Sequence, residues 1–354
     1  TATTEIYTLS LHDVFRSDQK YCIQLMDFLP AIQLWTPPSC CSNVLGSATE
    51  FIVIGDIHAG EKDLTPLVNQ ILRFQNAAKF VLTLGDIVQE SQNMSYWRTF
   101  FGQMTPLLSC FPFIYIPGNH DGYTRARKDP WRQLIRQPYV NPRDGCYFSL
   151  DYGNIHFVLL DNYNLFGDFG KLSKNQLVWL DQDLLNAEES PDIHHIILCL
   201  HKPPYSTGDV GVDHWLSAQI NARIQRNRKI KLVLSGHCHF YQHFLQKIDV
   251  GENERDIHFI ITGGGGGRLE KSVLRKIRFY RRPYYWTSKG EVQQPAFIPY
   301  RKFIKNNQNN AFIQANHQKS RIFRHFLHVK VTTEGFTIQV IGWDGICFEE
   351  IKIK

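Results

Sequence analysis

Residues 235–243 read SGHCHFYQH and directly follow the apolar run IKLVL of residues 230–234. Two of the three histidines in this stretch, His237 and His239, are separated by one residue. Side chains at positions i and i+2 of an extended backbone point to the same side, so both imidazoles can face one point while Cys238 faces away. Taken alone, such a pattern fits two surface histidines beside a turn as well as it fits a pair of metal ligands.

Four other segments favour the interpretation as metal ligands. Each is a run of residues typical of a β-strand that ends at side chains able to bind metal. These segments are FIVIGDIH (51–58), FVLTLGD (80–86), FIYIPGNHD (113–121) and HHIILCLH (194–201). Ligands of open α/β sheets bind at the carboxyl ends of the strands, so we expect the five strand ends to bring their side chains together. Their carboxylates, amide and imidazoles are too many for one four-coordinate ion and enough for two ions that share a carboxylate. The pattern predicts a two-metal hydrolytic site.

In this order, GDIH, GD, GNHD, H and GHCH resemble the five motifs of the calcineurin-like metallophosphoesterase family, over about residues 51–266. HKPPYS (201–206), LSKNQLVWL (172–180), Tyr241 and the glycine run near residue 263 are similar to the acid-phosphatase branch that includes the purple acid phosphatases. Purple enzymes, however, have a tyrosine ligand where this chain has Gln89, and they lack the histidine that this chain has as His58. The resemblance implies an α/β fold, a four-layer α/β/β/α sandwich with two mixed β-sheets, and a ligand set closer to that of ordinary metallophosphoesterases.

The resemblance also implies which residues hold the two ions. The implied ligands are Asp56, His58 and His239 for the first ion, Asn119, His201 and His237 for the second, and Asp86 as the carboxylate that both ions share. Nitrogen and oxygen ligands without a thiolate suit Mn, Fe or Zn better than Ca or Mg. Two transition-metal ions are therefore the expected cofactors.

His120 is left over from this ligand set. The resemblance implies that it faces the substrate, stabilises the phosphoryl oxygens and can protonate the leaving oxygen. Asp121 is expected to orient the ring of His120 and raise its basicity. Asn119 and His214 are expected to bind substrate together with His120. His214 is included because it follows the fourth motif closely.

The leading hypothesis is a phosphomonoesterase of the acid-phosphatase type, in which a metal-bound hydroxide attacks the phosphorus of a phosphorylated substrate. One alternative is a phosphodiesterase or nuclease that acts on nucleotides or nucleic acid. Another is a non-catalytic descendant that binds an anion or a partner. The complete ligand set argues against this last class, since a protein without activity has no need to keep every ligand.

The chain divides into an N-terminal extension, residues 1–49, expected to pack on the core, and a catalytic domain, residues 50–354. Within the extension, residues 21–29 are compatible with a short helix. Residues 268–320 form a basic insertion with twelve Lys and Arg and two acidic residues, a net charge of +10, whereas the whole chain has a charge of +6. Interleaved aromatic residues there could stack on nucleic acid bases. Such a surface could equally hold an anionic partner or membrane.

The remaining patterns predict the scaffold. Apolar residues from Leu64 to Leu72 have helical spacing, as do those from Met94 to Leu108, so each region predicts a helix lying on the sheet. Residues 146–161 predict a hairpin. Ser173 and Gln176 form a capping-box signature at the start of a helix. The glycines of residues 263–267 are expected to pack against the metal site, and the alternating residues near the C-terminus are expected to form strands at a sheet edge.

Composition narrows the class of protein further. No stretch of about 18 or more apolar residues exists, so no transmembrane segment is expected. The eight cysteines show no CxxC spacing, which argues against a zinc ribbon or a redox pair. The even cysteine count, the start at Thr1 and the NxS sequon at Asn93 favour an extracytoplasmic or secreted protein over a cytoplasmic one.

Overall fold

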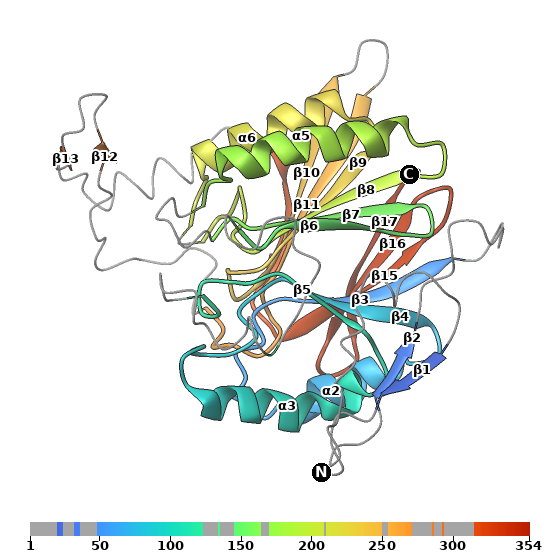
Figure 1. Ribbon diagram of the computed structural model, residues 1–354, viewed down its shortest axis with the longest axis vertical. Coiled ribbons are helices and arrows are strands. Elements are labelled where there is room, and N and C mark those ends of the chain that lie inside the picture. The colour runs from blue at the N-terminus through green and yellow to red at the C-terminus, as the bar shows by residue number, and fades with distance from the viewer. Residues whose placement is uncertain are drawn as a thin grey trace, which may run out of the picture.

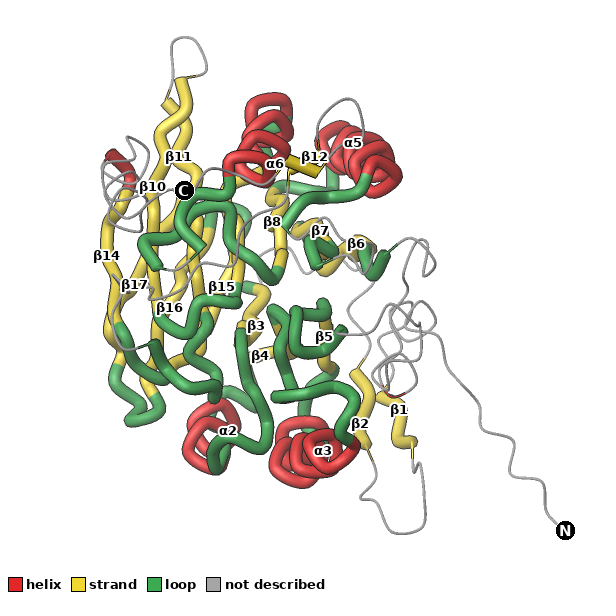
Figure 2. Tube along the Cα trace, turned by 90° about the vertical axis from the view of Figure 1, so that its left-hand side faces the viewer, coloured by secondary structure: helices red, strands yellow, loops and turns green. Residues whose placement is uncertain are grey.

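The structure is a computed structural model in which two β-sheets lie face to face and helices cover the outer face of each (Figure 1). It describes residues 48–122, 134, 145–163, 170–208, 210–249, 254–270 and 315–354 and the short segments 20–23, 32–35, 285–286 and 292–293. Helices α5 (Lys174–Glu189) and α6 (His214–Arg226) lie outside one sheet, and α2 (Thr65–Leu72) and α3 (Met94–Leu108) lie outside the other (Figure 2). The predicted α/β/β/α sandwich is confirmed.

The six-stranded sheet combines the first three motif segments with the C-terminal strands, in the order β17-β16-β15-β3-β4-β5. Its strands are β3 (Thr49–Ile54), β4 (Ala78–Thr83), β5 (Phe113–Tyr115), β15 (His325–Val331), β16 (Phe336–Gly342) and β17 (Cys347–Ile353). Strands β3, β4 and β5 pair in parallel, and α2 and α3 connect them. Strand β15 pairs antiparallel with β3, so the C-terminal strands extend the sheet to its edge, as predicted.

The seven-stranded sheet carries the fourth and fifth motifs, in the order β14-β10-β11-β9-β8-β7-β6. Its strands are β6 (Phe148–Tyr152), β7 (Ile155–Leu160), β8 (His195–Leu200), β9 (Ile230–Ser235), β10 (Tyr241–Asp249), β11 (Glu254–Thr262) and β14 (His317–Arg321). Strands β6 and β7 form the predicted hairpin. Strands β7, β8 and β9 are parallel, so their carboxyl ends lie at one edge.

Hydrophobic side chains fill the space between the sheets and the space under each helix pair. At the centre of the inter-sheet core, the ring of Phe51 stacks on Phe80 at 5.0 Å and meets the edge of Phe157 at 5.2 Å. Leu67 and Ile71 of α2 are fully buried, which confirms the predicted helix and its inner face. This packing holds the two sheets, and therefore their strand ends, in a fixed relation.

Two local predictions need correction. Residues 21–23, the start of the stretch expected to be helical, belong to β1 (Lys20–Ile23). This strand pairs antiparallel with β2 (Ile32–Trp35), and tertiary pairing overrides a weak helical preference. Ser173 caps α5 by accepting a hydrogen bond from the Gln176 N–H, as predicted. The side chain of Gln176 does not return to Ser173, however, but bonds the backbone N–H and C=O of Asp161.

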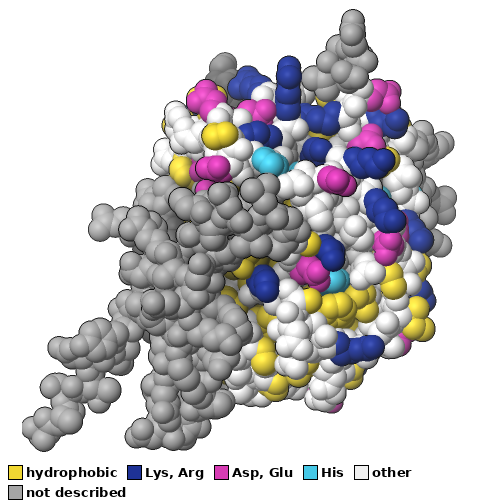
Figure 3. All heavy atoms as spheres, turned by 90° about the vertical axis from the view of Figure 1, so that its right-hand side faces the viewer, with side chains coloured by type: hydrophobic (Ala, Val, Ile, Leu, Met, Phe, Trp, Pro, Cys, Tyr) yellow, Lys and Arg dark blue, Asp and Glu magenta, His cyan; other side chains and the backbone are white. Residues whose placement is uncertain are grey.

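Most of residues 1–47 and most of the basic insertion, 268–320, lie outside the described residues, so the expected packing of the extension and the expected anionic partner stay predictions. Within the insertion, the short strands β12 (Tyr285–Trp286) and β13 (Val292–Gln293) pair with each other. On the face shown in Figure 3, basic and acidic side chains of the described residues are interspersed. None of the described helices is long and apolar enough to cross a membrane.

A buried histidine links the hairpin to α5. His156 Nδ1 lies 2.6 Å from Asp151 Oδ1, and its Nε2 lies 2.9 Å from Asp183 Oδ2. Burial alone would lower the pKa of His156, but the hydrogen bonds and charges of the two carboxylates raise it to about 9. The imidazolium therefore stabilises the contact between sheet and helix at neutral pH.

We expect this contact to weaken at alkaline pH. The pKa of His156 is about 9 in the folded chain and about 6.5 when unfolded, so its contribution is complete below pH 6.5 and is lost as the pH rises through 9. Because Asp151 is half-exposed, solvent weakens its interaction with His156. We therefore expect the free energy of unfolding to fall by about 2 kcal/mol, which is less than the whole pKa shift would give. Urea unfolding of the wild type and His156→Gln at pH 6 and 9.5 measures it. A difference between the two proteins that does not change with pH would contradict the prediction.

Candidate metal centre

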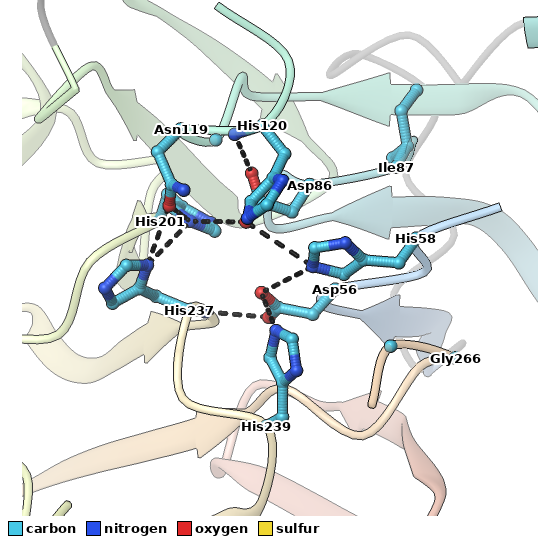
Figure 4. Close-up of polar contacts among 12 residues, drawn as sticks. Asp56, His58, Asp86, Ile87, Asn119, His120, His201, His237, His239 and Gly266 are labelled. Carbon is cyan, nitrogen blue, oxygen red and sulfur yellow. Dashed lines mark hydrogen bonds and ion pairs between the residues drawn. The ribbon is translucent and has the colours of Figure 1, made fainter. Parts of the chain in front are cut away.

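The sequence-predicted ligands lie where strands of both sheets end. Asp56 and His58 follow β3, Asp86 follows β4 and Asn119 follows β5, all in the six-stranded sheet. The other sheet supplies His201 after β8 and the pair His237 and His239 after β9. Their side chains converge on one region between the two sheets (Figure 4).

Backbone strain is concentrated at this point. The described residues other than glycine that have positive φ are Asp56 (60°), His58 (45°), Asp86 (53°) and His237 (68°). A left-handed conformation costs a non-glycine residue roughly 1–3 kcal/mol and persists where the surrounding structure enforces it, commonly at functional sites. The extended backbone expected from His237 to His239 is therefore wrong: His237 is left-handed, and the two rings belong to different clusters.

The first cluster consists of Asp56, His58 and His239, whose ligand atoms lie within 4.8 Å of one another. Asp56 Oδ1 lies 3.9 Å from His58 Nε2 and 3.4 Å from His239 Nε2. The other oxygen, Oδ2, accepts a hydrogen bond from the backbone N–H of His237 at 2.7 Å. One carboxylate oxygen is thus used to hold the backbone, and the other faces two imidazoles.

The second cluster consists of Asp86, His201 and His237, with the side chain of Asn119 beside them. Asn119 Oδ1 lies 3.0 Å from His201 Nε2 and 2.9 Å from His237 Nδ1. The two carboxylate oxygens of Asp86 have different tasks, as those of Asp56 do. Asp86 Oδ1 accepts a hydrogen bond from the His120 N–H at 2.7 Å. Its Oδ2 lies 3.3 Å from His201 Nε2 and 3.6 Å from His58 Nε2, so one oxygen reaches both clusters.

The charges of the site suit the binding of cations. Burial raises the pKa of both carboxyl groups, Asp56 and Asp86, but neighbouring imidazoles outweigh it and hold both pKa values below the usual range. Burial lowers the pKa of His201 and His239, yet the carboxylates raise each to about 9. Two imidazolium groups therefore balance the carboxylates when protons are the only cations, and metal ions would take over that positive charge.

Two buried polar atoms support the same conclusion. Asp56 Oδ1 and His58 Nε2 are both inaccessible to solvent, and neither has a hydrogen-bond partner among the described residues. A buried polar atom without a partner costs free energy, so a native site normally supplies one. Both atoms face the interior of the first cluster, where a cation would satisfy them.

Three of the four candidate ligand imidazoles are held at Nδ1 by an oxygen outside the clusters. His201 Nδ1 lies 2.7 Å from the carbonyl oxygen of Leu84, and His239 Nδ1 lies 2.7 Å from that of Arg268. His58 Nδ1 lies 2.6 Å from Gln89 Oε1. Each of these contacts directs the remaining nitrogen, Nε2, toward the carboxylates.

His120 lies beside the two clusters and forms a third group of possible metal ligands with His58 and Asp86, whose ligand atoms lie within 4.8 Å of one another. Its ring centroid is 4.6 Å from that of His58. Its Nδ1 lies 2.7 Å from the carbonyl oxygen of Gln89. The expectation that Asp121 orients this ring is wrong. Both oxygens of the buried Asp121 are used by backbone N–H groups instead, those of Asp86, Ile87, Val88 and Gly118.

Asp121 therefore fixes the loop that presents Asp86. Its pKa is raised to about 7 by burial and by the charge of Asp86, although the backbone hydrogen bonds oppose the rise. The sequence could not reveal this role, because it depends on the loops after β4 and β5 lying side by side.

The structure does not bring His214 into the site. It is the first residue of α6, is exposed, and does not line the cavity beside the clusters. Asp161, at the end of β7, has a local structural role, since its carboxylate accepts hydrogen bonds from the N–H groups of Cys146 and Tyr163.

Sequence reasoning missed two neighbours of the clusters. The ring of Tyr163 lies 5.5 Å from that of His201 and 5.6 Å from that of His237. Gln89 contacts both His58 and His120. Tyr163 follows the end of β7 as the ligands follow their strands, and this was the signal that could have found it.

The glycine run packs against the clusters as predicted, since each position has room for hydrogen only. A Cβ on Gly263 would lie 2.0 Å from the carbonyl oxygen of Cys238, and one on Gly265 would lie 2.3 Å from that of Gly55. A Cβ on Gly267 would lie 2.6 Å from His58 Cδ2 and 2.9 Å from His239 Cε1. The run thus forms one wall of the first cluster.

A cavity of about 480 Å³ opens beside both clusters. It is lined by Asp86, Asn119, His120, Val210, His237, Cys238, His239, Arg268, Leu269 and Glu270. A substrate bound there would meet His120 and Asn119 next to both clusters.

A two-sheet sandwich whose strand ends present His and Asp clusters is the architecture of a metallophosphoesterase, and the comparisons agree. Residues 49–241 match the family described as Calcineurin-like phosphoesterase. Because the match covers more than half of the 354 residues, the chain belongs to the calcineurin-like phosphoesterase family.

Individual relatives are more distant. The chain is 27% identical over 257 residues to Purple acid phosphatase 22 of Arabidopsis thaliana, covering 69% of this chain and 55% of that protein. It is 31% identical over 128 residues to a 3′,5′-cyclic-nucleotide phosphodiesterase of Nostoc sp., covering 35% of this chain and 43% of that protein. The chain thus spans about half the length of these curated relatives.

Among solved structures, the purple acid phosphatase PPD1 from yellow lupin (Lupinus luteus) seeds is similar, with a TM-score of 0.63 and 14% identity. The superposition covers 92% of this chain and 56% of that one. This similarity supports the fold.

The glycine wall generates a prediction with a matched control. Gly267→Ala should displace the rings of His58 and His239 and weaken metal binding at the first cluster about tenfold or more, because its Cβ has no room. A Cβ on Gly102, inside α3, would meet nothing within 4 Å. Gly102→Ala should therefore leave metal binding unchanged and stabilise the chain by about 0.5–1 kcal/mol. Chelator competition with Zn²⁺ and thermal unfolding measure both effects. Wild-type affinity at both sites in Gly267→Ala would contradict the packing argument.

Proposed function

We propose that the chain is a dinuclear-metal-dependent phosphoric ester hydrolase that acts on phosphomonoesters. The observation that carries the proposal is the pair of clusters joined by one oxygen, Asp86 Oδ2. Beside it, Asp56 Oδ1 and His58 Nε2 are buried without a hydrogen-bond partner among the described residues. Such an arrangement fits two cations that share a carboxylate.

In this proposal the chain supplies three ligands to each ion besides the shared Asp86. The ligands are Asp56, His58 and His239 on one side, and Asn119, His201 and His237 on the other. The donor atoms are nitrogen and oxygen, which suits Mn, Fe or Zn. Two bound ions would supply positive charge to the phosphoryl group and lower the pKa of a water molecule.

The residues beside the ligands have separate tasks. The carbonyl oxygen of Gln89 accepts a hydrogen bond from His120 Nδ1–H, so the doubly protonated ring would give the leaving oxygen its proton on Nε2 and keep the one on Nδ1. Asn119 lines the cavity and binds the phosphoryl group from the side of the second cluster. Arg268 also lines the cavity and adds positive charge for an anionic substrate.

The share of this chain that each relative matches supports a phosphomonoester over a phosphodiester as the substrate. The similarity to Purple acid phosphatase 22 extends over 69% of the chain, whereas that to the Nostoc phosphodiesterase extends over 35%. The phosphodiesterase has the higher identity over its shorter match, so a diester is the second candidate.

A substrate panel tests the proposal. The chain, loaded separately with Mn, Fe and Zn, is assayed on p-nitrophenyl phosphate, bis-p-nitrophenyl phosphate, 3′,5′-cyclic AMP and RNA. We expect the highest kcat/KM on the monoester, about two bound ions per chain, and the loss of both ions and of activity in Asp86→Ala. Faster turnover of a diester would favour the second candidate. Wild-type metal content in Asp86→Ala would refute the shared carboxylate.

His120→Ala separates proton donation from metal binding. We expect it to keep its metal ions and to lose activity by about two to four orders of magnitude, the usual range for a lost general acid. The loss should be smaller for p-nitrophenyl phosphate than for an alkyl phosphate, because p-nitrophenolate leaves without a proton. Metal analysis and kcat on the two substrates measure this. Loss of metal would instead identify His120 as a ligand.

A further inference from the structure

Gln89 contacts two imidazoles that the proposed function gives different tasks. Its side-chain Oε1 lies 2.6 Å from His58 Nδ1, and its main-chain oxygen lies 2.7 Å from His120 Nδ1. The two rings meet edge to face with an interplanar angle of 72°. One half-buried residue thus touches a candidate metal ligand through its side chain and the candidate acid through its backbone.

The contacts determine which nitrogen carries the proton in each ring. His58 Nε2 lies 3.9 Å from Asp56 Oδ1 and 3.6 Å from Asp86 Oδ2, both too far for a hydrogen bond. The proton of the neutral His58 ring therefore belongs on Nδ1, where Gln89 Oε1 accepts it, and the lone pair of Nε2 faces the cluster. A carbonyl oxygen only accepts, so His120 also carries a proton at Nδ1.

The anchor of His58 differs from those of the other candidate ligands. His201 and His239 are held at Nδ1 by main-chain oxygens, which no substitution removes. His237 faces Asn119 through its Nδ1 and is not held in this way. Among the described contacts, His58 is thus the candidate ligand whose anchor is a side chain.

We propose that Gln89 is a positioning residue that fixes the tautomer of His58 for the first ion and the ring of His120 for proton donation. The proposal rests on the proposed function, because it assigns a use to each ring. Among the described residues, its side chain contacts one candidate ligand, His58 of the first cluster, so removing the acceptor weakens one ion and spares the other. The main-chain contact to His120 remains in every variant at this position.

Equilibrium titration of the whole chain with Zn²⁺ against a chelator tests the side-chain role. Gln89→Met has a similar length without the amide oxygen, and we expect one of the two ions to bind about 10- to 100-fold more weakly. Gln89→Glu restores an acceptor and should bind both ions at least as tightly as the wild type. Gln92→Met, at an exposed position three residues further on, is the matched control and should not change binding.

The outcomes are distinct. A wild type that binds no Zn²⁺ would refute the proposed function itself. A wild type with two ions and an unchanged Gln89→Met would refute only the role of Gln89, as would equal weakening of both ions or a failure of Gln89→Glu to restore binding.

A spectroscopic measurement checks the tautomer without any assay of activity. In long-range ¹H–¹⁵N spectra of the ¹⁵N-histidine-labelled chain, metal-free and zinc-loaded, we expect the His58 proton on Nδ1, with the signal assigned from His58→Gln. Gln89→Met should lose this preference in the metal-free state, and the His120 signal should not change. A His58 proton on Nε2 in the wild type would overturn the inference.

Discussion

Two carboxylates buried in one site, Asp56 and Asp86, are the constraint on which this structure depends. Ionised groups removed from water have to be balanced by nearby positive charge and hydrogen bonds. Each carboxylate meets the requirement in the same way: one oxygen accepts a backbone N–H bond and the other faces imidazoles. Both residues also have a left-handed backbone, which persists where the surrounding contacts enforce it.

The loops around the carboxylates follow from the same requirement. Gly118 has no side chain because a Cβ there would lie 2.2 Å from Asp86 Oδ1. Asp121 gathers backbone N–H groups from two loops and so stiffens the turn that carries Asp86. The Asp121 carboxylate thus lies behind the site rather than in it, and it contributes by holding the backbone of the turn that carries Asp86.

The sequence predicted those parts that depend on local pattern: the strand ends, the helices on their outer faces, the hairpin and the glycine wall. Errors arose where a role depends on two segments distant in sequence. Asp121 was paired with its chain neighbour His120, whereas its oxygens meet the loop after β4. His214 was placed by its nearness to a motif, yet α6 begins there and leaves it exposed. Gln89 was noted as a missing tyrosine, and its contact with His58 became visible only once two strand ends were placed together.

The two clusters draw their side chains from opposite layers of the sandwich. In the first cluster, Asp56 and His58 come from the six-stranded sheet and His239 from the seven-stranded one. In the second cluster, Asp86 comes from the six-stranded sheet and His201 and His237 from the seven-stranded one. A cation held in either cluster would link side chains of the two sheets. By mass action, a ligand that binds only the folded chain stabilises it by about 4 kcal/mol at a thousand times its Kd. The free energy of unfolding would then rise and fall with the concentration of free metal around the protein, so the same chain would resist unfolding less where metal is scarce.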